Sequence, residues 1–191
     1  MIDESRLNLD FRQSLLSCVL SSYGIVANYF TGQAITDFFQ AYCLHFNLPY
    51  QNWQQAEQIY ANHFDKEWKT RRCRGYEIIV DLHQNSRIPA FIECRAWFNA
   101  RFIMNSEEEI GNLEKTLQDQ AAFLNMTYES GTNYHSVTIF HNGRVLRVRD
   151  TNTNLLRDVD SLSSLGKLRD SVLYSKKYEC PNNVAVLALF R

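Results

Sequence analysis

Four side chains in this sequence could together perform nucleophilic chemistry: those of Gln13, Cys18, His135 and Asp150. An ionised thiol is a strong nucleophile, an imidazole can take up its proton, and a carboxylate can hold the imidazole in the tautomer that does so. An amide N–H can stabilise the oxyanion that forms when a nucleophile attacks a carbonyl group. These roles require the side chains to meet, so the elements that carry them decide whether the chemistry is available.

The stretch 134–152 predicts a β-hairpin that carries His135 and Asp150. Asn142-Gly143 is the strongest short-range signal for a two-residue type I′ turn, in which both central residues take positive φ. With this pair at the tip, the register places Phe140 opposite Val145, Ile139 opposite Leu146, Val137 opposite Val148 and His135 opposite Asp150. The Cβ atoms of such a cross-strand pair lie about 4.5 to 5.5 Å apart.

Side chains alternate between the two faces of a strand, so one face of the hairpin carries His135, Val137, Ile139, Leu146, Val148 and Asp150. The other face carries Ser136, Thr138, Arg147 and Arg149. The apolar face must contact the core, which takes the imidazole and the carboxylate inward together. The pair is then either a base with its orienting carboxylate or an ordinary structural hydrogen bond, and a nucleophile elsewhere would favour the first interpretation.

Cys18 lies in a stretch from Gln13 to Thr36 that contains no charged residue. The stretch is too rich in Ser, Gln, Asn and Gly for a membrane span, and a buried central helix fits better. Ser17 is the expected N-cap, which places Cys18 in the first turn, and residues 28–32 have the composition of a helix end. Unpaired N–H groups and the helix dipole there favour the thiolate. The Gln13 amide and the Cys18 N–H could then form an oxyanion hole.

These residues resemble the papain-like cysteine peptidases, and within that superfamily the leader-peptide peptidases of bacterial bacteriocin exporters and their stand-alone relatives. The likeness lies in a Gln and a Cys that open a helix ending in Asn-Tyr-Phe-Thr-Gly, and in a His that begins a strand followed by an Asp that ends the next. It covers residues 11–32 and 133–152. The resemblance implies Cys18 as nucleophile, His135 as base, Asp150 as orienting carboxylate and Gln13 as oxyanion-hole side chain.

The chain departs from the family pattern at two positions near the thiol. Gln13 and Cys18 are one residue closer together than is usual in the family, and Val19 stands where Gly usually follows the Cys. Asn152 is an alternative orienting residue, because some papain relatives use Asn in that role. Asp150 ranks first because the predicted register places it directly opposite His135.

Composition favours one globular domain over residues 1–191. The formal net charge is −1, so nothing indicates binding to nucleic acid or a membrane, and no pattern points to an oligomeric state. The five cysteines include no Cys-x-x-Cys pair, which argues against a zinc ribbon or a dense disulfide framework. The first residues carry no signal-peptide pattern, so we expect synthesis as a cytoplasmic protein and leave export without a signal peptide open.

The remaining segments predict an α+β domain with a papain-like arrangement, in which a helical N-terminal half holds the buried nucleophile helix against an antiparallel sheet in the C-terminal half. We expect helices at 33–47 and 51–68, strands at 76–82 and 88–94, a loop with a short helix at 158–171 and a buried strand at 184–190. Ser106 and Glu109 form a capping box, followed by an apolar helical stripe of Ile110, Leu113, Leu117 and Leu124.

The sequence thus favours a thiol hydrolase that cleaves a peptide or amide bond of a peptide or protein substrate, with no metal and no organic cofactor. Two other functions stay open. A bacterial effector or toxin of papain-like fold could use the same thioester for glutamine deamidation, transglutamination or acyl transfer. A catalytically inactive papain-like domain, with Cys18 packed beneath Val19 and Tyr23, would instead bind a partner.

Overall fold

The computed structural model describes residues 1–13, 17–71, 79, 93–98, 100–130, 133–168 and 184–191. Residues 76–78 and 80–82 of the strand predicted at 76–82, residues 88–92 of the strand predicted at 88–94, Cys73 and Cys180 lie outside these residues. Ile79 is helical, so the strand prediction is wrong at that residue, and Cys94 lies in a strand as predicted. Helices and a six-stranded antiparallel sheet make up the described structure. The prediction of a mixed helix and antiparallel-sheet class is therefore confirmed.

Most of the described helices precede the sheet strands in the chain. The helices are α1 (Cys18–Thr31), α2 (Ile35–His45), α3 (Trp53–Arg71), α5 (Arg101–Met104) and α6 (Glu107–Asp119), with single 3-10 segments η1 (Glu4–Arg6) and η2 (Leu162–Leu168). The strands are β1 (Cys94–Trp97), β2 (Phe123–Ser130), β3 (Asn133–His141), β4 (Leu146–Asp150), β5 (Leu155–Val159) and β6 (Val184–Phe190). The helices predicted at 33–47 and 51–68 are confirmed as α2 and α3.

The strand order in the sheet is β1-β6-β2-β3-β4-β5, and every neighbouring pair is antiparallel. The strand predicted at 184–190 is confirmed as β6, which lies between β1 and β2 and is buried along its whole length. An uninterrupted apolar run is what a strand covered on both faces requires. Segment 158–171 begins with the end of β5 rather than a loop, and its predicted short helix is η2.

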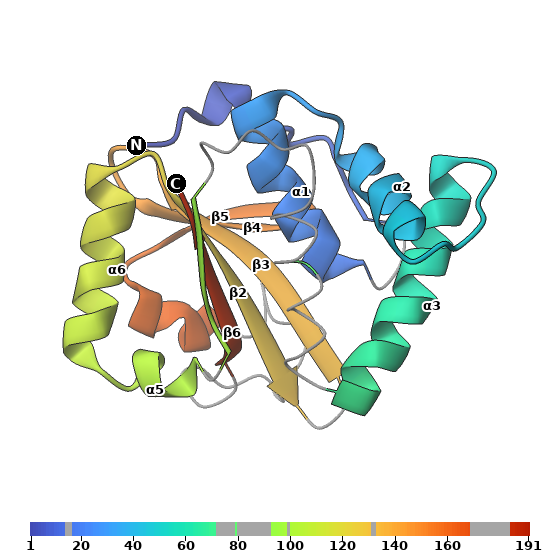
Figure 1. Cartoon of the computed structure of the whole chain (residues 1–191). Coiled ribbons are helices and arrows are strands. Elements are labelled where there is room, and N and C mark those ends of the chain that lie inside the picture. The colour runs from blue at the N-terminus through green and yellow to red at the C-terminus, as the bar shows by residue number, and fades with distance from the viewer. Residues whose placement is uncertain (14–16, 72–78, 80–92, 99, 131–132, 169–183) are drawn as a thin grey trace.

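Helices cover both faces of the sheet (Figure 1). On one face, α1, α2 and α3 pack over Phe123, Phe140, Val186 and Phe190. On the other, α5, α6 and η2 pack over a cluster that includes Val137, Ile139, Leu146 and Val148. The expectation that these four hairpin residues share one apolar face is confirmed, and the opposite face proves to be buried as well.

Helix α6 begins as predicted but ends earlier. The Ser106 hydroxyl accepts a hydrogen bond from the Glu109 N–H at 3.3 Å, so the N-terminal half of the capping box is present. The prediction that the helical stripe reaches Leu124 is wrong, because the helix ends at Asp119 and Leu124 lies in β2. Gln120 takes extended backbone angles, and the chain beyond it pairs with both β3 and β6. Strand pairing on two sides thus overrides a spacing that also fits a helix.

The predicted hairpin forms, but its register differs by two residues. Ile139 faces Val148 and Phe140 faces Arg147, and the pairing of β3 with β4 ends at Thr138 and Arg149. His135 and Asp150 are therefore not directly opposite each other, and that prediction is wrong. Because the shift is an even number of residues, each side chain keeps its predicted face.

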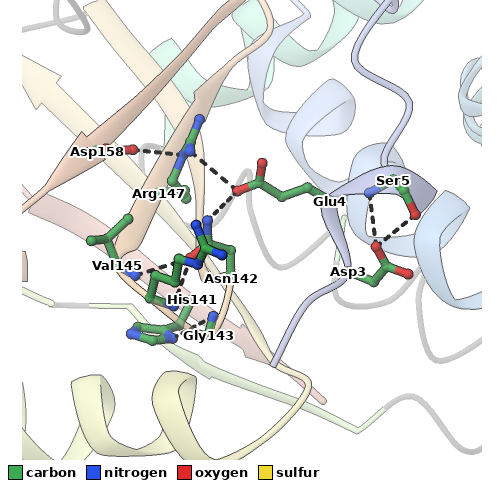
Figure 2. A network of polar contacts seen from close by, with 10 residues as sticks. Asp3, Glu4, Ser5, His141, Asn142, Gly143, Val145, Arg147 and Asp158 are labelled. Carbon is green, nitrogen blue, oxygen red and sulfur yellow. Dashed lines mark hydrogen bonds and ion pairs between the residues drawn. The ribbon is translucent and has the colours of Figure 1, made fainter.

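The register shift comes from the turn, which is centred on Gly143-Arg144 rather than on Asn142-Gly143. The Asn142 N–H donates to the Val145 carbonyl, and only Gly143 in this turn has positive φ, at 98°. The Asn142 side chain accepts from the N–H groups of Arg144 and Val145 and donates to Glu4 (Figure 2). Asn142 thus acts through its side chain, and the predicted type I′ turn is wrong.

Candidate active site

Helix α1 places Cys18 at its first position. The helix begins at Cys18 and ends at Gly32, a left-handed C-cap with φ of 72° whose N–H donates to the Asn28 carbonyl. Both predicted ends of this helix are confirmed. Cys18 is 3% exposed. A residue at this position lies beside N–H groups that have no partner within the helix and beside the positive end of the helix dipole.

Helix α3, rather than Ser17 alone, completes the start of α1. Ser17 occupies the N-cap position but its hydroxyl makes no capping hydrogen bond and instead donates to the Glu57 carboxylate at 2.8 Å. The Tyr60 hydroxyl accepts from the Leu20 N–H at 3.2 Å. Ser17 is therefore the N-cap residue, as predicted, but its side chain contacts the buried Glu57 carboxylate on α3 instead of capping a backbone N–H. Burial raises the pKa of Tyr60 well above its usual value, so its oxygen stays a neutral acceptor.

His135 and Asp150 meet despite the altered register. His135 Nε2 lies 3.1 Å from Asp150 Oδ2, and the two residues are 6% and 0% exposed. The second oxygen, Oδ1, accepts from the Asn152 N–H at 2.9 Å. Both carboxylate oxygens are thus held, and the backbone of Asn152 supports Asp150. A buried carboxylate in this position fixes the tautomer of the ring.

Cys18 is the second partner of the imidazole. Burial lowers the pKa of His135, but hydrogen bonds to Asp150 and Cys18 and the negative charges of both outweigh burial and raise it from 6.5 to about 10. Because Nε2 faces Asp150, Nδ1 is the ring nitrogen left for the sulfur. A ring held between a carboxylate and a thiol can exchange a proton with the thiol.

Gln13 reaches the same place from the N-terminal segment. It is 5% exposed, its N–H donates to the Thr151 carbonyl at 3.1 Å, and its Oε1 accepts from the Thr151 hydroxyl at 2.6 Å. Thr151 directly follows Asp150. The Thr151 hydroxyl holds Oε1 as an acceptor, and this contact orients the Gln13 amide. The structure therefore brings Gln13, Cys18, His135 and Asp150 into one region of the molecule.

The other described cysteines lack comparable surroundings. Burial raises the pKa of Cys43 to about 11 and that of Cys94 to about 12. Among the described residues, no group of three or more His, Cys, Asp or Glu side chains is arranged to hold a metal ion. Within the same part of the chain, no helix combines the length and apolar character needed to cross a membrane.

Sequence analysis missed several residues that support the site: Glu57, Tyr60, Arg149 and Thr151. Glu57 and Tyr60 are three positions apart and so lie on one face of α3, and a Glu in an otherwise apolar face is a detectable signal. Thr151 could have been suspected from its place next to Asp150. The alternation of side chains in β4 shows which face of the sheet Arg149 lies on. It does not show that this face is buried, because the burial depends on segments distant in the sequence that pack against it.

No protein-family model matches the sequence, and no curated protein matches it either. The chain superimposes on the crystal structure of the Pseudomonas avirulence protein AvrPphB with a TM-score of 0.39 and 13% sequence identity, over 91% of this chain and 89% of that chain. At these values the similarity is too low to assign a shared fold or activity.

Proposed function

We propose that this protein is a papain-like thiol hydrolase that cleaves an amide bond through Cys18, His135 and Asp150. The observation that carries the proposal is the pair of contacts made by the His135 ring, with Asp150 on one side and Cys18 on the other. A His-Asp pair with a purely structural role needs no thiol beside it. A catalytic triad requires the carboxylate, the imidazole and the nucleophile to lie next to one another in this spatial order.

The contacts support the following acylation step. Nδ1 of His135 takes the proton of Cys18, and the thiolate attacks the carbonyl carbon of the substrate to form a C–S bond. The electron pair of the carbonyl moves to its oxygen, where the Gln13 amide and the Cys18 N–H stabilise the oxyanion. When this intermediate collapses, the C–N bond breaks, and the His135 imidazolium gives its proton to the leaving amine.

Hydrolysis of the thioester completes the cycle. His135 takes a proton from water, and the resulting hydroxide equivalent attacks the acyl carbon. The C–S bond then breaks, the acid leaves, and the proton returns to the sulfur of Cys18. Asp150 stabilises the imidazolium in both halves of the reaction.

Selective alkylation of Cys18 tests the activated thiol. At neutral pH, iodoacetamide should modify Cys18 much faster than Cys43 or Cys94, because burial raises the pKa of those two thiols. The rate at Cys18 should fall in His135→Ala, while Cys43→Ser, the matched control, should leave it unchanged. Slow and equal labelling of Cys18, Cys43 and Cys94 would contradict the proposal and favour an inactive binding domain.

Mass spectrometry of treated substrates defines the bond attacked. Incubation with an unfolded protein such as reduced casein should yield new peptide termini with wild-type protein and none with Cys18→Ala. A gain of about one mass unit on glutamine, without cleavage, would replace the protease by a deamidase that uses the same thioester. Absence of any modification by an alkylation-competent protein would remove the hydrolase proposal.

A further inference from the structure

The buried guanidinium of Arg149 joins the N-terminal segment that leads to Gln13 to the end of β4, which carries Asp150. Arg149, the residue before Asp150 in β4, is 2% exposed. Its Nη1 donates to the carbonyl of Asp150 at 3.2 Å, and its Nη2 donates to the carbonyls of Leu9 and Phe11 at 2.9 and 2.7 Å. Nη2 also donates to the side chain of Asn154.

The chemistry of these contacts explains why an arginine can be buried here. An ion in the protein interior is costly unless hydrogen bonds compensate for the lost water. The two Nη groups of Arg149 have four oxygen partners, an arrangement that a lysine ammonium cannot reproduce, whereas the buried Nε has no hydrogen-bond partner among the described residues. Asn154 presents its oxygen from a left-handed backbone conformation, with φ of 57°. The guanidinium therefore specifies the positions of the segments around it.

The bound carbonyls belong to the segment that leads into Gln13. Leu9 and Phe11 lie four and two residues before Gln13. Three more contacts continue this attachment, since Arg12 Nε donates to the Asn152 carbonyl at 3.2 Å and Gln13 exchanges two hydrogen bonds with Thr151. Segment 9–13 is thus attached along residues 149–154 of the β4 end.

We propose that Arg149 is a positioning residue that sets the location of the Gln13 amide relative to the Asp150–His135 pair. This inference rests on the proposed function, because it assigns Gln13 to the oxyanion hole. Asp150 has two further contacts of its own, to His135 and to the Asn152 N–H. Loss of the guanidinium should therefore displace Gln13 more than Asp150, and should impair oxyanion stabilisation more than activation of the thiol.

The test compares Arg149→Lys with Arg147→Ala. Arg147 lies on the same strand and face and forms ion pairs with Glu4 and Asp158, so it attaches the N-terminal segment to β4 at Glu4 rather than at residues 9–13 (Figure 2). We expect Arg149→Lys to lower kcat by about tenfold or more with little change in KM. The reason is that the variant displaces the Gln13 amide, and complete loss of one oxyanion-hole donor lowers kcat by about 100- to 1000-fold. The alkylation rate of Cys18 and its pH profile should stay within about twofold of wild type. Arg147→Ala should match wild type in all three measurements.

Several outcomes would overturn the inference. An unchanged kcat in folded Arg149→Lys would do so, and so would equal losses in kcat and in alkylation rate, which would indicate a general structural role. If Arg149→Lys does not fold, Asn154→Gly removes one acceptor from the guanidinium at an exposed position and keeps the positive φ. That variant should lose about threefold in kcat with normal alkylation, and an unchanged kcat would count against the inference.

Hydrogen exchange separates this inference from the proposed function. In Arg149→Lys the Gln13 N–H should exchange faster than in wild type, whatever reaction the protein catalyses. Wild-type protein that turns over no substrate would disprove the proposed function alone. If wild-type protein is active, and Arg149→Lys has the same kcat and the same hydrogen-exchange rate at the Gln13 N–H, the positioning role alone is disproved.

Discussion

Asp150 Oδ2 lies 3.1 Å from His135 Nε2, although the two residues are not opposite each other in the pairing of β3 with β4. The contact therefore depends on side-chain reach at the end of the strand pair and on the hydrogen bond from the Asn152 N–H that holds the other carboxylate oxygen. Because Asp150 contacts the imidazole directly, removing the charge of Asp150 tests its role.

Asp150→Asn should shift the alkaline limb of activity to lower pH. Burial lowers the pKa of His135, and the hydrogen bonds and charges of Asp150 and Cys18 raise it to about 10. Without the Asp150 charge the imidazolium should lose its proton nearer to neutral pH, and kcat/KM at neutral pH should fall by about tenfold or more. The pH dependence of kcat/KM measures both effects.

Asn152→Ala is the matched control for Asp150→Asn. It removes the side chain but keeps the N–H that donates to Asp150. The pH profile should therefore remain that of wild type. A larger effect in Asn152→Ala than in Asp150→Asn would transfer the orienting role to Asn152.

His135 should also make stability depend on pH. Its pKa is raised to about 10 in the folded chain from 6.5 in the unfolded chain, so the folded state binds the proton more tightly. The resulting stabilisation is fully present below pH 6.5 and is lost as the pH rises through about 10. Urea unfolding at several pH values across this window should show a steeper decline for wild type than for His135→Gln. The exposed His45, changed to Gln, is the control, and identical slopes in wild type and His135→Gln would contradict the prediction.

Tyr60→Phe should weaken the start of α1 and change the reactivity of Cys18. The variant removes the oxygen that accepts from the Leu20 N–H, and loss of such a cap costs about 1 kcal/mol in the free energy of unfolding. Tyr29→Phe also removes an acceptor of a backbone N–H, that of Asp3, but far from the thiol. Both variants should be less stable in urea, and only Tyr60→Phe should alter the alkylation rate of Cys18. An effect of Tyr29→Phe on alkylation would indicate that global stability controls the thiol.

Gly24→Ala should destabilise the packing of α1 against α2. A Cβ on Gly24 would lie 2.7 Å from Cγ2 of Ile35, a buried β-branched side chain with little freedom to move. Overpacking of this kind costs about 1–3 kcal/mol. Gly111→Ala, in the middle of α6 with open space around it, should instead stabilise by about 0.5–1 kcal/mol. Thermal unfolding of both variants measures the difference, and equal effects would contradict the close approach of α1 and α2.

The sequence alone determined features that depend on residues close together in the chain. The end of α1 at Gly32 and the Ser106 cap of α6 follow from residues within one turn of the backbone groups that they serve, and the position of Ser17 marks the start of α1 although its side chain caps no N–H group. The faces of β3 and β4 follow from the alternation of side chains, which a two-residue register shift leaves unchanged. Cys18, His135 and Asp150 could therefore be selected as candidates without a structure.

Only the tertiary structure decided which groups these residues meet. The Asn142 side chain bonds to the turn and to Glu4, which moves the turn by one residue. Ser17 bonds to Glu57 on α3, and Arg149 binds the carbonyls of a segment about 140 residues away, at Leu9. Each of these choices is a competition between hydrogen-bond partners, and long-range packing determines which partner is within reach. The position of Gln13 beside Thr151 belongs to the same class, because no local pattern brings the N-terminal segment to the end of β4.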